Sequence, residues 1–195
     1  MLGARRALPR LFGVGAALAA GLGGVRNFSA SAGVLGTHFW LRHETKPNEG
    51  RTALLPYHAK DLLDRGHAVT VERSPARCVE DEEYEKVGCK LAETNSWVQA
   101  PLDAVILGLK ELPDEIPVLQ HRHIYFAHCY KNQTGWEEIL GRFVDGGGHL
   151  YDLEFLLDDS KKRVAAFGWS AGYAGTAVAL QAWALQKTAP EEKLS

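Results

Sequence analysis

Leu107-Gly-Leu-Lys-Glu-Leu-Pro113 and Tyr125-Phe-Ala-His-Cys-Tyr-Lys131 are the two stretches that decide the predicted fold. Each continues an apolar run, residues 104–107 or 124–127, with the length and composition of a buried strand. Polar residues just past the carboxyl ends of buried strands lie where open α/β sheets bind their ligands. We therefore predict one crevice for proton transfer and acid binding, lined by Lys110, Glu111, His128 and Lys131.

Strands and helices are predicted to alternate from Thr37 onward. The predicted strands are residues 38–41, 67–71, 89–92, 103–107, 123–127, 149–153 and 164–167. The predicted helices are residues 56–66, 81–88, 134–142 and 170–186, and Thr134 and Glu137 have the spacing of a capping box. This alternation predicts the α/β class, with an open, mostly parallel sheet covered by helices on both faces.

Residues 1–33 differ in composition from the rest of the chain. They contain Arg5, Arg6, Arg10 and Arg26 and no acidic residue, with an Ala- and Gly-rich middle and a Ser-containing end. This composition is typical of a mitochondrial transit peptide, and we expect a disordered leader. A secretory signal and an untargeted, cytoplasmic chain are the alternatives, and the apolar run is too short for a membrane span. Residues 188–195 form a polar tail.

The bulk composition of the 195 residues, 46% apolar and 24% charged, fits a globular domain with a core. A formal net charge of −2 and the lack of a basic stripe argue against nucleic-acid binding. The three cysteines form no CxxC pair and are predicted to be reduced thiols. Strand alternation separates His121 and His123 from His128, which argues against a metal site.

Six ordered motifs after the leader resemble those of one enzyme family. They are Leu41-Arg-His-Glu-Thr-Lys-Pro47 with Glu49 and Arg51, Val71-Glu-Arg-Ser-Pro75, Gly108-Leu-Lys-Glu-Leu-Pro113, Phe126-Ala-His-Cys-Tyr-Lys-Asn-Gln133, Tyr151-Asp-Leu-Glu-Phe155 and Arg163-Val-Ala-Ala-Phe-Gly168. In this order and spacing they resemble the N-terminal domain of the NAD-dependent, lysine-forming saccharopine dehydrogenases, within the wider alanine dehydrogenase and transhydrogenase N-terminal group. The likeness covers residues 37–187, which we expect to form one substrate domain, the Rossmann-like half of a two-domain dehydrogenase.

The resemblance implies an activity in lysine metabolism, in which NAD oxidises saccharopine to an imine and hydrolysis then gives lysine and 2-oxoglutarate. It implies that Lys110 and His128 are the catalytic acid/base pair. The substrate-binding residues that it implies are Lys46, Arg51, Lys131, Glu154 and Arg163, and the charge-tuning residues are Glu49 and Glu111. These residue types suit the task, because fixed cations bind carboxylates and an imidazole exchanges protons near neutral pH.

Each of these residues also has a simpler interpretation when it is considered alone. Lys110 at a strand end is ordinarily a solvated charge, and His128 after an apolar run can cap a strand. The loop from Lys46 to Arg51 fits an exposed, salt-bridged loop. Arg163 beside two lysines fits a solvated charge cluster. Without the resemblance, the residues leave both interpretations open.

The chain departs from the family in one respect that affects activity. Family members carry a second lobe that binds NAD, whereas this sequence contains no GxGxxG after a predicted strand. We therefore expect no NAD site in this chain and no hydride transfer by the chain alone. Three hypotheses follow: the substrate domain of a saccharopine dehydrogenase-like oxidoreductase, whose NAD lobe a separate chain could supply; a noncatalytic accessory subunit of a larger mitochondrial assembly; or a binding module for an amino or dicarboxylic acid.

Overall fold

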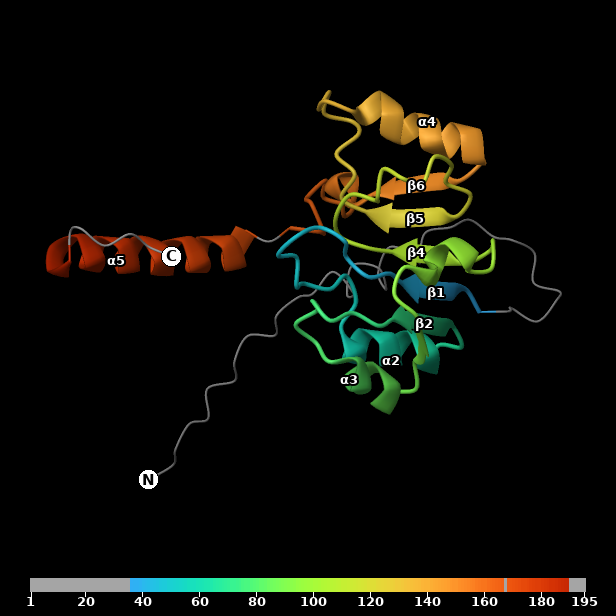
Figure 1. The fold of residues 1–195 in the computed structure, drawn as a ribbon, viewed down its shortest axis with the longest axis horizontal. Helices are drawn as coiled ribbons and strands as arrows, with labels where there is room; N and C mark the ends of the chain where they lie inside the picture. Colours follow the sequence, from blue (N-terminus) through green and yellow to red (C-terminus); the bar gives the residue numbers. More distant parts are fainter. Residues whose placement is uncertain (1–35, 167, 190–195) are drawn as a thin grey trace. The chain divides into compact units, whose positions relative to one another are not determined.

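The computed structural model of the protein describes residues 36–166 and 168–189 (Figure 1). The predicted leader and most of the predicted polar tail lie outside these residues. The chain divides after Val164 into two compact units. The first contains the sheet, and the second contains one long helix.

Six parallel strands form the sheet of the first unit (Figure 1). They are β1 (His38–Leu41), β2 (Ala68–Glu72), β3 (Lys90–Ala92), β4 (Val105–Leu107), β5 (Arg122–Tyr125) and β6 (His149–Asp152). Their order in the sheet is β3-β2-β1-β4-β5-β6, so the chain reverses direction across the sheet between β1 and β4. This observation confirms the predicted α/β class and the parallel sheet. Open α/β sheets bind ligands beyond the carboxyl ends of their strands at such a reversal.

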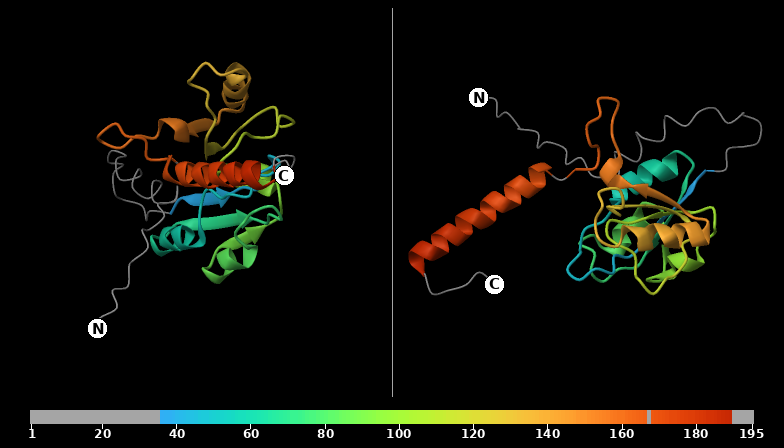
Figure 2. Two further views of the ribbon diagram at one scale, coloured as in Figure 1. Left: turned by 90° about the vertical axis from the view of Figure 1, so that its left-hand side faces the viewer. Right: turned by 90° about the horizontal axis from the view of Figure 1, so that it is seen from above.

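Helices cover both faces of this sheet, as predicted (Figure 2). Helices α2 (Pro56–Asp64) and α3 (Asp81–Lys86) lie on one face, and α4 (Trp136–Gly146) lies on the other. Two short 3₁₀ segments, η2 (Ser96–Gln99) and η3 (Leu153–Phe155), complete the unit. Helix α2 begins at a proline, which needs no hydrogen-bond acceptor there, and α3 begins with three acidic residues that favour the positive end of its dipole.

The core on the α4 face contains a row of side chains that crosses the sheet. Trp40, Ile106, His123 and Leu150 are in register on four neighbouring strands. His123 is fully buried between the rings of Trp97 and Phe143. Burial lowers its pKa to about 3, and neither ring nitrogen has a hydrogen-bond partner among the described residues. His123 is therefore neutral in the folded protein at physiological pH.

The predicted strand at residues 164–167 is wrong for the three residues that the structure describes, and Phe167 lies outside them. Arg163, the residue before this segment, pairs with Leu157 in an isolated antiparallel bridge. This bridge closes a tight hairpin in which Lys161 has a positive φ of 65°. The two alanines that follow Val164 have a low strand propensity and offer little surface for packing on a sheet.

The predicted capping box of α4 is also wrong. The N-cap residue is Gly135, with φ of 89°, and no side chain caps the helix. A left-handed backbone at this position suits glycine far better than the neighbouring Thr134. The helix also continues beyond Arg142 to Gly146, where Gly147 ends it in a left-handed conformation.

Helix α5 (Gly168–Thr188) makes up most of the second unit. Its observed bounds extend the predicted helix by two residues at each end. The helix has apolar residues all round and no buried side chain. None of the described helices is both long and apolar enough to cross a membrane.

Candidate functional site

The segments that follow β4 and β5 run side by side past the end of the sheet. Gly108 N–H donates to the carbonyl of Ile124 at 3.0 Å, and Phe126 N–H donates to the carbonyl of Leu109 at 3.2 Å. Lys110 is the residue after Leu109 on the first segment. His128 lies two residues after Phe126 on the second segment. Because neighbouring strands lie about 4.8 Å apart, the structure places both predicted acid/base residues at one edge of the sheet.

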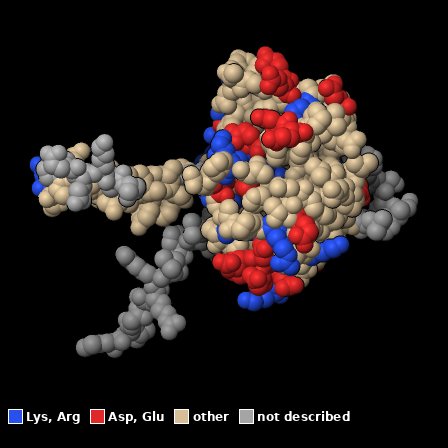
Figure 3. Space-filling model, in the orientation of Figure 1, with Lys and Arg blue, Asp and Glu red and all other residues tan. Residues whose placement is uncertain are grey.

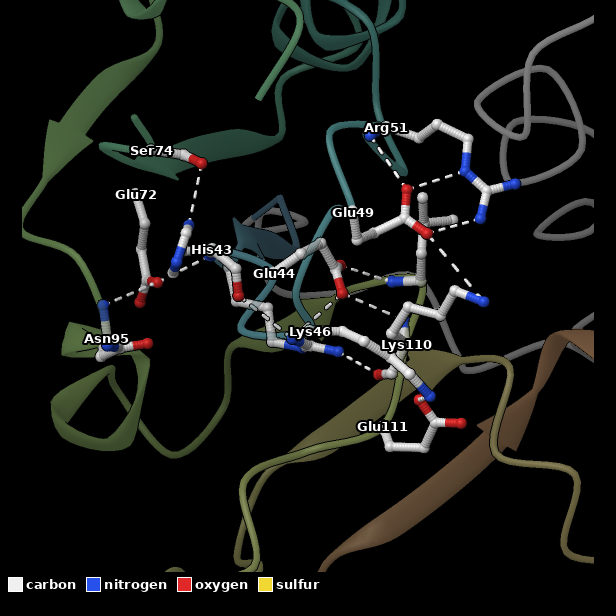
Figure 4. A network of polar contacts seen from close by, with 12 residues as sticks. His43, Glu44, Lys46, Glu49, Arg51, Glu72, Ser74, Asn95, Lys110 and Glu111 are labelled. Carbon is white, nitrogen blue, oxygen red and sulfur yellow. Dashed lines mark hydrogen bonds and ion pairs between the residues drawn. The ribbon is translucent and has the colours of Figure 1, made fainter. Parts of the chain in front are cut away.

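A buried glutamate, Glu49, is the centre of the polar network beside Lys110 (Figure 4). The Arg51 guanidinium holds its carboxylate with two hydrogen bonds, at 2.7 and 2.5 Å, and the Arg51 N–H adds a third at 3.0 Å. Lys110 Nζ lies 3.9 Å from the same carboxylate. The hydrogen bond from Arg51 is the main reason that the pKa of Glu49 lies below its usual value. We call these three residues the Glu49 centre.

A buried ion pair fixes the backbone that carries Lys110. Arg42 and Glu44 are almost fully buried, with 3.3 Å between guanidinium and carboxylate. The two oxygens of Glu44 accept from the N–H groups of Leu109 and Lys110, at 2.6 and 3.0 Å, and Arg42 donates to the carbonyl of Lys110. Position 108 is glycine for a steric reason, since a Cβ there would lie 2.6 Å from the Cζ of Arg42.

Glu72, at the end of β2, joins three loops at the same edge (Figure 4). Its buried carboxylate accepts from Trp40 Nε1 and from the backbone N–H groups of His43, Asn95 and Trp97, at 2.5 to 3.1 Å. His43 Nδ1 lies 2.8 Å from the hydroxyl of Ser74. Four donors around one buried carboxylate satisfy its charge, so this group orders the loops.

The remaining predicted site residues beside the Glu49 centre, Lys46 and Glu111, form a partly exposed ion pair at 3.0 Å. Burial raises the pKa of Glu111, but hydrogen bonds from its own N–H and from Lys46 outweigh burial and lower it overall. Both side chains are about half exposed, so the pair contributes little stability and both groups remain accessible.

A second buried glutamate, Glu154, organises the polar network beside His128. Its carboxylate receives Arg163 at 2.7 Å and also Lys131, and His128 Nδ1 lies 3.9 Å away. The His128 ring stacks on Phe126, with 6.2 Å between centroids. Burial raises the pKa of Glu154, but Lys131, Arg163 and His128 outweigh burial and lower it overall. We call Glu154, Lys131, Arg163 and His128 the Glu154 centre.

Positive and negative side chains therefore alternate at the carboxyl edge of the sheet. Figure 3 shows Lys and Arg atoms next to Asp and Glu atoms along the edge toward which the strands point. A mixed edge of this kind is chemically suited to a ligand that carries both carboxylates and an amine, whereas nucleic acid needs a continuous basic surface.

Sequence reasoning missed the residues that hold the site in place. Arg42, Glu44, Glu72 and Asp152 were not predicted, although each lies in a motif quoted for the resemblance. A usable signal was the ionisable residue directly at the end of an apolar run, because a charge so close to a core needs a partner. The predicted site residues at the Glu49 and Glu154 centres lie at the expected edge, and their roles stay predictions.

The thiol groups of Cys89 and Cys129 donate no hydrogen bond to these carboxylates. Cys89 and Cys129 are buried free thiols, and burial raises the pKa of each to about 11. His121 and His123 lie in the core, where His121 Nε2 is 3.0 Å from the carbonyl of Ala100. Among the described residues, no group of three suitable side chains could hold a metal ion.

Comparison with known proteins identifies relatives for this fold and site. Residues 40–174 match the model of the family "Alanine dehydrogenase/PNT, N-terminal domain". The chain is 60% identical over 153 residues to saccharopine dehydrogenase [NAD(+), L-lysine-forming] of Emericella nidulans, covering 78% of this chain and 41% of that protein. The corresponding enzyme of Yarrowia lipolytica is 55% identical over 153 residues, covering 78% and 42%. These values confirm the resemblance predicted from the motifs.

A solved structure of L-alanine dehydrogenase shares the fold, with a TM-score of 0.53 and 16% identity, over 65% of this chain and 35% of that one. The chain spans about two fifths of the length of the curated relatives that it matches.

Proposed function

The chain belongs to the alanine dehydrogenase/PNT N-terminal domain family, and from this premise we propose that it is the substrate-binding domain of a saccharopine dehydrogenase-like oxidoreductase of lysine metabolism. The proposed reaction is the NAD-dependent oxidation of saccharopine to lysine and 2-oxoglutarate, the chemistry that the names of its relatives indicate. One observation carries the proposal: each predicted proton-transfer group lies beside its own buried glutamate, and each of these glutamates also binds an arginine.

The cations of the two centres suit the carboxylates of such a substrate. The side chains of Arg51, Lys131 and Arg163 are each about half exposed, so they contact solvent as well as their glutamates. A solvent-exposed guanidinium is a good binding group for the carboxylate of a ligand, because it is always charged and planar. Two separate cationic groups favour a ligand with carboxylates at both ends.

The proposed chemistry of this chain is the proton transfer of imine hydrolysis. His128 accepts the proton of the attacking water, and Lys110 protonates the departing amine. The carboxylates of Glu49 and Glu154 lie 3.9 Å from Lys110 and His128 respectively, and they stay ionised because their pKa values are lowered. The ionised Glu154 carboxylate thus places a fixed negative charge beside the imidazole that receives the proton.

The described residues do not fit NAD. The β1–α2 connection is where a dinucleotide fold of this type carries closely spaced glycines. In this chain that connection, residues 42–55, contains one glycine, Gly50, instead of closely spaced glycines, and Glu44 and Glu49 already occupy the nearby amides of Leu109, Lys110 and Arg51. We therefore propose that hydride transfer requires a dinucleotide-binding lobe in addition to the residues described here, and we derive no step through the cofactor.

Calorimetry of the purified full chain with saccharopine, 2-oxoglutarate, lysine and NADH tests this function. We expect saccharopine and 2-oxoglutarate to bind, and Arg51→Ala and Arg163→Ala each to weaken binding by roughly tenfold or more, because each removes a charge-assisted contact. Arg65→Ala is the matched control, because Arg65 is an exposed arginine at the C-terminal end of α2.

The same titrations distinguish the other hypotheses. Binding of NADH by the chain alone contradicts the proposed need for another lobe. Binding of 2-oxoglutarate without saccharopine supports a simple dicarboxylic-acid binding module. Failure of every ligand to bind, together with stable incorporation into a larger assembly, supports a noncatalytic accessory subunit.

Residues 1–33 are proposed to direct the chain to mitochondria. Their arginine-rich, acid-free composition supports the proposal. A fluorescent protein fused after residue 36 should colocalise with a mitochondrial dye, and replacement of the four arginines by glutamate should leave it in the cytoplasm. Cytoplasmic fluorescence of the unaltered fusion would contradict the targeting role.

A further inference from the structure

We propose that Asp152 is a positioning residue, which holds His128 and Glu154 in their mutual orientation without contacting the substrate. This inference rests on the proposed function, because it assigns His128 a role in proton transfer. Asp152 ends β6, the strand next to the one that leads to His128. Neither the sequence motifs nor the family relationship assigned it a role.

The carboxylate of Asp152 binds three backbone amides from two separate segments. Its Oδ1 accepts from Ala127 N–H at 3.2 Å and from Glu154 N–H at 3.0 Å, and its Oδ2 accepts from Cys129 N–H at 3.2 Å. Ala127 and Cys129 are the residues on either side of His128, so the two oxygens straddle it. The same carboxylate therefore fixes the backbone of His128 and the backbone of Glu154.

His128 requires such support, because its backbone is in the left-handed region, with φ of 56°. A residue other than glycine in this conformation costs on the order of 1 kcal/mol, and it persists only where its surroundings hold it. Hydrogen bonds from amides to an ionised carboxylate are stronger than those between neutral groups. The bonds on both sides of His128 offset the strain and fix the direction of its side chain.

The distance between His128 and Glu154 makes this support consequential. His128 Nδ1 is 3.9 Å from the Glu154 carboxylate, which is too long for a hydrogen bond. This nitrogen is buried and has no hydrogen-bond partner among the described residues. A displacement of less than 1 Å decides whether the pair forms, and Asp152 holds the backbone of both partners.

A simple capping role does not account for these contacts. Asp152 precedes the 3₁₀ segment η3 and accepts from Glu154 N–H, which is all that an N-cap requires. The two bonds to the amides around His128 reach a different segment, 25 and 23 residues earlier in the chain. No ion pair of Asp152 is present in the described part of the chain, so its charge is balanced by amides.

Nuclear magnetic resonance of the unliganded full chain tests the inference. In Asp152→Asn the amide group has one acceptor oxygen, and its NH₂ faces N–H donors, so at least one bond beside His128 is lost. We expect changes in the φ-sensitive backbone coupling of His128 and in its ring ¹⁵N shifts. Asp158→Asn is the matched control, because Asp158 likewise accepts a backbone N–H, from Lys162 at 2.9 Å, in an exposed turn.

A titration of the unaltered chain keeps the test independent of whether the variant folds. The amide shifts of Ala127, Cys129 and Glu154 should move with one shared midpoint as Asp152 is protonated, and the His128 coupling should change at the same pH. Separate midpoints, or a His128 coupling that does not change, overturn the inference. An Asp152→Asn variant whose His128 signals match those of Asp158→Asn overturns it as well.

Ligand binding then separates this inference from the proposed function. If the chain binds 2-oxoglutarate, Asp152→Asn should weaken binding by about tenfold while Asp158→Asn leaves it unchanged, since misplacing an oriented group is costly. If the unaltered chain binds no acid, the proposed function fails, whereas the resonance measurements still decide whether Asp152 positions His128.

Discussion

The Glu49 centre and the Glu154 centre share one plan but are held in place differently. In each, a buried glutamate binds an arginine, and a candidate proton-transfer group lies 3.9 Å from its carboxylate. In each, a second carboxylate binds the backbone beside that group, from Glu44 for Lys110 and from Asp152 for His128. The plan is repeated on neighbouring segments at one edge of the sheet.

The difference lies in what balances the second carboxylate. Glu44 is paired with the buried Arg42, which also binds the Lys110 carbonyl, and Lys110 has an ordinary negative φ. Asp152 is balanced by amides and supports a left-handed residue. A buried ion pair thus supports the Glu49 centre, whereas no buried cation supports the Asp152 carboxylate beside the Glu154 centre in the described part of the chain. Loss of the buried pair that supports the first centre should therefore cost much stability, whereas damage to the second should leave the fold and alter the site.

The largest expected effect comes from Arg42→Met. This change leaves the buried Glu44 carboxylate without its cation, and breaking a buried ion pair in this way costs about 3–5 kcal/mol. Urea unfolding of the full chain, followed by tryptophan fluorescence, measures the loss. Arg65→Met, at an exposed arginine, should cost less than about 0.5 kcal/mol. A loss below about 1 kcal/mol for Arg42→Met would show that the Glu49 centre is no more coupled to the fold than the Glu154 centre.

The next effect is the pH dependence of stability that His123 causes in the core. It has to be eliminated before the acid sensitivity of the two centres can be compared. Burial lowers the pKa of His123 to about 3, so the folded protein binds this proton less well than the unfolded chain. The stability that neutral His123 confers is complete above about pH 6.5 and is lost as the pH falls toward 3, by about 1.4 kcal/mol per pH unit.

His123→Leu should flatten that decline and raise stability at pH 5 relative to the parent chain. Urea midpoints of both proteins at pH 7, 6 and 5 measure the effect. His149→Leu is the control, because His149 is exposed on β6. Parallel stability curves for His123→Leu and the parent chain would mean that His123 is hydrated or paired in the folded state.

Gly108→Ala tests the same comparison by disturbing the backbone that leads to Lys110. A Cβ at this position would overlap the Arg42 guanidinium, which is held by Glu44 and by the carbonyls of His43 and Lys110. The overlap should cost about 1–3 kcal/mol and displace Lys110, while the amide signals around His128 stay in place. Gly141→Ala is the control, since a Cβ at that helical position meets nothing within 4 Å and should be neutral or slightly stabilising.

The sequence predicted the sheet and the edge of the site because both depend on local patterns. The apolar run at residues 104–107 marks a buried strand, and the charged residues that follow it lie at the carboxyl end of the sheet. The positive φ at His128 could not be predicted, because a histidine adopts it only when distant groups hold it there. The role of Asp152 depends on amides in a segment more than twenty residues away, which no local pattern reveals.

The α4 cap shows the same limit on a smaller scale. Thr134 and Glu137 have the correct spacing for a capping box, yet Gly135 between them takes a left-handed conformation and starts the helix one position later. Two local signals competed, and the backbone preference of glycine won. The boundary of the helix was uncertain from sequence for this reason, whereas its existence was not.

The smallest expected effect is the loss of stability when each buried glutamate is replaced, measured in the His123→Leu background. The pKa values of Glu49 and Glu154 both lie below the usual value. Each carboxylate therefore stabilises the folded state above the pKa of the unfolded chain, about 4.5, and this contribution disappears as the pH falls through the lowered pKa. Glu49→Gln and Glu154→Gln should each cost about 1 kcal/mol at pH 7 and progressively less toward pH 3.

Glu49→Gln should cost more than Glu154→Gln. The strongest influence on the pKa of Glu49 is the favourable hydrogen bond from Arg51, whereas the strongest on the pKa of Glu154 is unfavourable burial, which its positively charged neighbours together outweigh. Urea unfolding of both variants at pH 7 and pH 3.5 gives the comparison, with Glu115→Gln as a control at an exposed glutamate. The reverse order would mean that the Glu154 centre contributes more to stability than the Glu49 centre. The distinction between the two centres would then rest on Arg42 alone.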